Sequence, residues 1–87
     1  MAFIPFCHVN KTRNIAYCKA FGENLRKLRK KKGFTMMEFA FEADIEYSQI
    51  AKIERGISNT TISTILLLAN ALQVKPLDLF KFDFPSH

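Results

Sequence analysis

The chain has 87 residues, 48% of them hydrophobic, and a formal net charge of +5. This length suits one small domain with a modest core, and no apolar run reaches the ~18 residues that a membrane-spanning helix needs. Cys7 and Cys18 are too few for a disulfide framework, and the N-terminal MAFIPFCHV lacks the basic start of a signal peptide, so we expect a cytoplasmic protein with no membrane partner.

The first part of the chain predicts a short extension followed by one long helix. Residues 1–11 form the extension, of which residues 1–10 are expected to be irregular or a short strand. A helix is predicted from Thr12 to Lys31, and Gly33 ends it. Its apolar stripe at helical spacing consists of Ile15, Cys18, Phe21, Leu25 and Leu28.

Positive charge is concentrated on this first helix. Between Lys11 and Lys32 there are nine Lys or Arg residues and one acid, Glu23, whereas four bases and seven acids follow Gly33. A run of bases is often only a solvated helix face, but it also suits a polyanionic partner.

Residues 35–56 predict two short helices joined by a tight turn. Thr35 can cap the first helix, and Phe39, Ala40 and Ala43 fall on one face of it. Asp44 lies at the turn, because Asp tolerates the left-handed conformation better than most residues. A pair of this length can present its second helix to the major groove of DNA.

The second helix of the pair is expected from about Glu46 to Arg55. Ile50 and Ile53 would be buried, and Gly56 would end the helix in the left-handed conformation. The residues left on its outer side are Tyr47, Ser48, Gln49 and Lys52.

The remainder predicts two more helices and an aromatic tail. After a loop over 57–59, Thr60 or Thr61 caps a helix with the core face Ile62, Ile65, Leu68, Ala69 and Leu72. Pro76 suits the first turn of a fifth helix, which closes a domain spanning 12–80. In the tail, residues 81–87, Phe82 and Phe84 continue from Phe80 with strand spacing.

Five segments of the chain, in this order, resemble the Cro/repressor-type (XRE) helix-turn-helix family. The segments are FGENLRKLRKKKG, the helix pair 35–56, its Ile53-Glu54-Arg55-Gly56 ending, TISTILLLANALQV and Pro76-Leu77-Asp78-Leu79-Phe80. The resemblance covers residues 21–80 and implies an all-α, compact five-helix, lambda-repressor-like DNA-binding domain.

The resemblance also implies roles for single residues. Tyr47, Ser48, Gln49 and Lys52 would lie at the DNA bases. A salt bridge between Arg29 and Glu54 would fix the recognition helix and leave Arg29 able to meet phosphate. The other phosphate contacts would come from Thr35, Met36, Arg55, Ser58 and Asn59.

Several residues depart from the family pattern. Met36 replaces the usual Gln and has no side-chain donor, Asp44 replaces the turn Gly, and Glu46 repels DNA although it suits the helix dipole. Met37 and Phe41 fall on the outward side of the first helix of the pair, where polar residues are expected.

These observations predict a sequence-specific regulator of transcription that binds double-stranded DNA, as a repressor or an autoregulatory controller. We expect a homodimer that uses Leu79, Phe80, Phe82 and Phe84; the alternative is that the two termini pair and complete the monomer core. A second reading is a protein-interaction module, such as an antitoxin, that binds a partner protein through its exposed apolar surface.

The sequence supports no enzyme, cofactor or metal site. It has no phosphate-cradling Gly loop and no nucleophile motif, and no small-molecule substrate is evident. The potential ligands Cys7, His8, Cys18 and His87 fit no zinc spacing.

Overall fold

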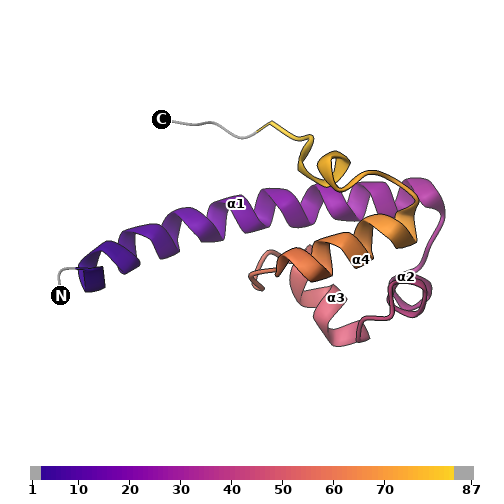
Figure 1. The fold of residues 1–87 in the computed structure, drawn as a ribbon, viewed down its shortest axis with the longest axis horizontal. Helices are drawn as coiled ribbons and strands as arrows, with labels where there is room; N and C mark the ends of the chain where they lie inside the picture. The colour runs from indigo at the N-terminus through magenta and orange to yellow at the C-terminus, as the bar shows by residue number, and fades with distance from the viewer. Residues whose placement is uncertain (1–2, 84–87) are drawn as a thin grey trace.

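The computed structural model describes the backbone of residues 3–83 and the side chains of residues 15–83. Over this range the chain forms four α-helices and one 3-10 helix: α1 (Phe3–Lys32), α2 (Met36–Ala43), α3 (Tyr47–Glu54), α4 (Ile62–Leu72) and η1 (Pro76–Phe80). The long helix α1 runs along one side of the molecule, with α3 and α4 packed against its C-terminal half, α2 near its C-terminal end and η1 packed against both α1 and α4 (Figure 1).

The predicted all-α class is confirmed, and three details of the prediction are wrong. Helix α1 begins at Phe3 rather than near Thr12, so residues 3–10 are helical. The predicted fifth helix is a five-residue 3-10 helix, which leaves four α-helices instead of five. Phe82 lies outside any strand despite its alternating pattern with Phe80, and Phe84 lies outside the described residues.

The helices enclose one small core. Phe39 and Ala43 of α2, and Ile50 and Ile53 of α3, pack against buried residues of α1 and α4, as their spacing predicts. The buried apolar residues are Phe21, Leu25, Phe39, Ala40, Ala43, Ile50, Ile53, Leu68, Ala69, Leu72 and Leu79.

Two residues assigned to the core from periodicity alone lie on the surface. Ile15 is exposed, because it precedes the part of α1 that the other helices cover, and Ile62 in the first turn of α4 is 86% exposed. Periodicity identifies the apolar side of a helix but not how far along the helix its neighbours reach.

The helix ends follow the predicted capping chemistry. The Thr35 hydroxyl accepts a hydrogen bond from the Glu38 backbone N–H at 3.1 Å, and the Glu38 carboxylate accepts one from the Thr35 N–H at 2.9 Å. Thr61 caps α4 by accepting from the N–H of Thr64. Asp44 adopts the left-handed conformation at φ 59°, which confirms its place at the turn.

Two glycines allow close backbone approaches to α1. A Cβ on Gly22 would lie 2.3 Å from the carbonyl oxygen of Ile53, so α3 packs directly on the α1 backbone. Gly56 has φ +78° and would place a Cβ 2.5 Å from the Cα of Lys19. The predicted helix stop at Gly56 is confirmed, and this position also needs the absence of a side chain.

Phe80 and the described part of the aromatic tail pack on α1. The ring of Phe80 lies 5.0 Å from that of Phe21, and the ring of Phe82 lies 5.3 Å from that of Tyr17. Leu79 is fully buried, so its predicted place in a dimer interface is wrong. The described part of the tail contributes to the monomer core by packing on α1, whereas the expected pairing of the two termini lies outside the residues whose side chains are described.

Candidate nucleic-acid interface

The helix pair is built around the turn at Asp44. Left-handed Asp44 ends α2, and the N–H of Ile45 donates to the carbonyl of Ala40 at 3.0 Å, so the chain turns sharply from α2 into α3 over residues 44–46. Ile45 is half-buried against the core and fixes the start of α3. The turn therefore holds α2 and α3 in one rigid unit.

Helix α3 presents a polar row on the side opposite to its buried residues. Ile50 and Ile53 anchor it to the core, whereas Ser48, Gln49 and Lys52 are exposed and Tyr47 is 49% exposed. Ser48 and Lys52 are four residues apart, so they lie on one helical face. These four residues are the ones predicted to meet DNA bases, and α3 brings them together.

The predicted bridge between Arg29 and Glu54 is confirmed. The guanidinium donates from Nε to Glu54 Oε2 at 2.6 Å and from Nη2 to Oε1 at 3.1 Å, a bidentate arrangement. Its Nη1 donates to the carbonyl oxygen of Phe34 at 2.8 Å. Arg29 therefore ties α1 to the end of α3 and to the segment that leads into α2.

Burial of this ion pair limits what Arg29 can do. Arg29 and Glu54 are 7% and 8% exposed, and all three guanidinium nitrogens donate to protein atoms. The predicted direct phosphate contact by Arg29 does not fit this geometry, because the charged group faces the protein interior. Its contribution is to position α3.

The other predicted phosphate contacts lie on two segments that flank α3. Thr35 and Met36 begin α2, where the first backbone N–H groups of the helix have no partner within the helix. Met36 is half-buried and its side chain packs against the core, so its backbone is the part available at this end. Arg55 and Asn59 are exposed and Ser58 is half-buried on the segment after α3.

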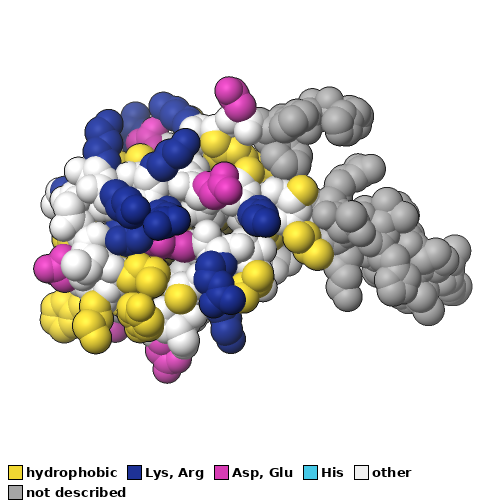
Figure 2. All heavy atoms as spheres, turned by 180° about the vertical axis from the view of Figure 1, so that it is seen from behind, with side chains coloured by type: hydrophobic (Ala, Val, Ile, Leu, Met, Phe, Trp, Pro, Cys, Tyr) yellow, Lys and Arg dark blue, Asp and Glu magenta, His cyan; other side chains and the backbone are white. Residues whose placement is uncertain are grey.

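Charge is distributed unevenly around these elements. The last turn of α1 carries Arg29, Lys30, Lys31 and Lys32, the sign that a helix C-terminus favours. Figure 2 shows Lys and Arg side chains over the upper and middle part of this face, and an apolar cluster flanked by acidic side chains below them, at the end where α2 lies. Glu46, the residue before α3, is exposed and its side chain makes no capping bond, so it adds a negative charge at the start of this helix.

Two residues that position the site were not predicted. Gly22 sets the distance between α1 and α3, and the Asn24 side chain donates to the carbonyl oxygens of Asp78 at 3.2 Å and Leu79 at 2.9 Å. A Gly inside a predicted helix is a signal of close packing, because Gly is otherwise unfavourable there. No sequence pattern indicates the partners of Asn24, which lie more than fifty residues away in the chain.

The described residues contain neither a membrane-spanning helix nor a cluster of metal ligands. None of the helices in this part of the chain is sufficiently long and apolar to span a membrane. Within the same range, no three His, Cys, Asp or Glu side chains are grouped as metal ligands. Cys7, His8 and His87 lie outside the residues whose side chains are described.

Comparison with known proteins agrees with this geometry. Residues 25–79 match the helix-turn-helix family HTH_3. The control protein C.BamHI of Bacillus amyloliquefaciens is 36% identical over 63 residues, which cover 71% of this chain and 78% of that protein. An uncharacterised HTH-type transcriptional regulator, y4dJ of Sinorhizobium fredii, is 34% identical over 61 residues, which cover 70% of this chain and 79% of that protein.

Solved structures show the same fold. The restriction-modification controller protein C.AhdI from Aeromonas hydrophila superimposes with a TM-score of 0.72 at 38% identity, covering 72% of this chain and 96% of C.AhdI. The clp gene regulator ClgR from Corynebacterium glutamicum gives a TM-score of 0.71 at 25% identity, covering 74% of this chain and 82% of ClgR.

The chain belongs to the helix-turn-helix family HTH_3, and the resemblance to Cro/repressor-type proteins is confirmed. Its recognition helix is α3. The protein is accordingly a DNA-binding regulator of transcription.

Proposed function

We propose that the chain is an operator-binding controller of a small set of genes, which reads DNA as a homodimer with α3 in the major groove. The observation that carries this proposal is the polar row on α3, held rigid by the buried bridge from Glu54 to Arg29. The likeness to the controller proteins C.BamHI and C.AhdI supports a controller in particular.

The four exposed residues of α3 have different side-chain chemistry, and each contacts a different kind of group on the DNA. Lys52 donates to guanine acceptors, and Ser48 and Gln49 pair with several base edges. The Tyr47 ring contacts a thymine methyl or packs on the backbone of the groove. Lys52 and Ser48 share a face, so together they address neighbouring base pairs.

Phosphate groups are held on both sides of α3. On one side, the free N–H groups at the start of α2 and the Thr35 hydroxyl face the backbone; on the other, Arg55, Ser58 and Asn59 do so. The basic end of α1 adds long-range attraction, which suits a polyanion.

The dimer interface that we propose is the exposed apolar face of α4. The exposed apolar side chains of α4 are Ile62, Leu66 and Leu67. Ile62 and Leu66 are four residues apart and form a stripe that an isologous partner can cover with the same residues. A single helix-turn-helix contacts few phosphates, so two copies on adjacent half-sites bind far more tightly.

The DNA test uses fluorescence anisotropy on a labelled duplex from upstream of the gene, with a scrambled duplex beside it and a series of salt concentrations. Wild type is expected to prefer the native duplex, and Lys52→Ala to lose about 1–3 kcal/mol of that discrimination. Lys75→Ala is the matched control, since Lys75 is exposed at the start of η1 and should leave discrimination unchanged. Equal binding to both duplexes by wild type contradicts the proposal.

The dimer test is sedimentation equilibrium of wild type and Leu66→Lys. A charge at the centre of the proposed stripe should convert the dimer to a monomer, whereas Glu23→Lys, on exposed α1 surface, should not. A wild-type protein that remains monomeric at micromolar concentration contradicts this interface.

A second candidate function, binding of a partner protein, is supported by the outer face of α2. Met37 and Phe41 are 71% and 83% exposed, and two shallow depressions adjoin them. Their rim is acidic, with Glu38 and Glu42 on one side and Asp44 and Glu46 on the other. Such a surface suits a basic amphipathic segment and repels DNA. Phe41→Ser should abolish binding of that partner and leave operator affinity unchanged.

A further inference from the structure

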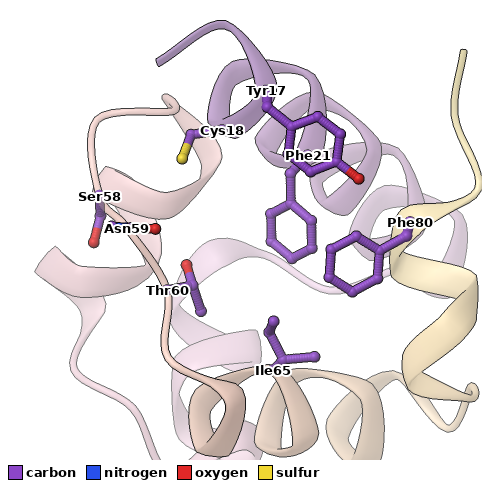
Figure 3. A pocket seen from close by; sticks show the side chains of 8 residues that line it. All are labelled: Tyr17, Cys18, Phe21, Ser58, Asn59, Thr60, Ile65 and Phe80. Atoms are coloured by element: carbon purple, nitrogen blue, oxygen red, sulfur yellow. The ribbon is translucent and has the colours of Figure 1, made fainter. Parts of the chain in front are cut away.

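We propose that a cavity between α1, the 57–61 segment and η1 is a binding site for a small neutral aromatic molecule with one ring, of the phenol class. The cavity has a volume of about 110 Å³ and is partly open to solvent. Figure 3 shows the eight side chains that line it. None of the functions described above uses it as a site.

One side of the cavity is aromatic and aliphatic. The rings of Phe21 and Phe80 stand next to each other with centroids 5.0 Å apart, and Tyr17 lies at the top in Figure 3. Ile65 of α4 forms the floor. Aromatic rings pack favourably against such a wall in tilted or offset geometry.

The opposite side is polar but uncharged. Cys18 and the side chains of Ser58, Asn59 and Thr60 line it, and none of the residues around the cavity is Asp, Glu, Lys or Arg. Among the described residues, no hydrogen bond engages the side chains of Asn59 and Thr60. A neutral ligand with one hydroxyl can therefore place its ring on Phe21 and Phe80 and its hydroxyl on this polar wall.

The size of the cavity selects a single ring. A closed apolar cavity of roughly 150 Å³ stays dry and accepts benzene, and this smaller cavity is open at one side, so part of a ring can project from it. The wall formed by Phe21, Phe80 and Ile65 offers water no hydrogen-bond partner, so a ring is the better occupant on that side. A charged ligand is too costly to desolvate here, and a two-ring ligand is too large for the cavity.

Occupation of the cavity has a consequence for DNA binding, which rests on the proposed function. Ser58 and Asn59 are both lining residues and proposed phosphate contacts. When they turn towards a ligand they are withdrawn from the phosphate, so ligand and DNA oppose each other. By linkage, each must then weaken the other by the same factor.

The binding test uses phenol as the probe and the full chain carrying Cys7→Ser, so that Cys18 is the remaining thiol. Phenol in the millimolar range should slow alkylation of Cys18 by iodoacetamide several-fold and shift the Ile65 methyl signals in a carbon–proton NMR spectrum. Benzoate, which has the same ring and a charge, should do neither. Unchanged alkylation and unchanged Ile65 signals with phenol overturn the proposal.

Two variants test whether phenol causes the slower alkylation of Cys18 and the shifted Ile65 signals by binding in the cavity. Thr60→Leu fills the cavity and should abolish both responses, whereas Ser63→Leu, a similar change on the exposed surface of α4, should preserve both. Circular dichroism confirms that each variant is folded. Loss of both responses in Ser63→Leu, or their survival in folded Thr60→Leu, overturns the assignment to this cavity.

The effect of phenol on operator binding is measured separately, by fluorescence anisotropy of the labelled duplex in the presence of phenol. Weaker operator binding in wild type but not in Thr60→Leu supports the coupling. If the protein fails to select its operator while phenol still protects Cys18, the proposed function fails and the cavity stands. If operator binding is intact and phenol binds without changing it, the coupling is wrong.

Discussion

Gly22 of α1 lies against the carbonyl oxygen of Ile53 in α3, with only 2.3 Å between that oxygen and the position of a Cβ on Gly22. The carbonyl oxygen of Glu54 would be 2.6 Å from the same Cβ. Both obstructing atoms belong to the α3 backbone, so they cannot move as a flexible side chain would. The recognition helix is thus seated on a backbone surface that only glycine provides.

Replacement of Gly22 by Ala should therefore destabilise the fold although Ala favours helices. Separation of α1 and α3 is expected to cost about 1–3 kcal/mol, the usual range for overpacking. Urea unfolding of Gly22→Ala and of Glu23→Ala, an exposed neighbour, provides the measurement and its control. A variant as stable as wild type would show that the two helices separate freely.

The bridge between Arg29 and Glu54 should behave as a buried, coupled pair. Arg29→Met alone leaves the Glu54 carboxylate buried without its partner and is expected to cost about 3–5 kcal/mol. The double variant Arg29→Met with Glu54→Met should cost clearly less than the sum of the single changes. The measurement is a double-mutant cycle of urea unfolding, and additive costs would contradict the coupling.

The same cycle separates stability from DNA reading. Variants that remain folded but lack the bridge should bind operator less selectively, because α3 is no longer held at a fixed angle. Anisotropy on native and scrambled duplexes measures this effect. Undiminished selectivity in a folded Arg29→Met variant would show that the bridge does not position α3.

The left-handed conformation at Asp44 predicts a stabilising substitution. Asp44→Gly should raise the free energy of unfolding by roughly 0.5–1 kcal/mol, because glycine adopts φ 59° without a steric penalty. Glu42→Gly is the matched control: it also replaces an acid by Gly but lies inside α2, where Gly costs about 1 kcal/mol. In thermal unfolding, the melting temperature should therefore rise for Asp44→Gly and fall for Glu42→Gly. A change in the same direction for both variants would contradict the turn geometry.

Acid should weaken the contact between η1 and the residues around it. The hydrogen bond from the Lys81 side chain and that from the Lys75 backbone N–H hold the pKa of Asp78 below its ordinary value of 3.8. A carboxylate whose pKa is lower in the folded state stabilises that state above pH 3.8, and this contribution is lost as the pH falls through the lowered pKa. Asp78→Asn should therefore be less stable than wild type at neutral pH.

The difference in unfolding free energy between Asp78→Asn and wild type should shrink as the pH falls from 3.8 through the lowered pKa, because Asp78 is protonated there and both side chains are then uncharged. Urea unfolding at a series of pH values measures it. A difference that stays constant down to the acid limit would show that the carboxylate charge does not stabilise η1.

The sequence by itself determined the helix pair and its chemistry. Thr35, Asp44 and Gly56 are local signals whose backbone conformations follow from their own side chains, and the spacing of Ile50 and Ile53 defines which face of α3 is buried. The bridge between Arg29 and Glu54 came from the family resemblance, because a contact across 25 residues has no local signal.

Tertiary structure alone decided which apolar residues remain exposed. Alternation of Phe80 and Phe82 with charged residues indicated a strand, yet both rings pack on α1, and Asn24 binds the carbonyl groups at the end of η1. Ile62 has the spacing of a core residue but lies beyond the reach of its neighbours. Local patterns reflect the energy of a short segment, whereas burial depends on where distant segments of the chain meet, and so the cavity and the free face of α4 appear only in the folded structure.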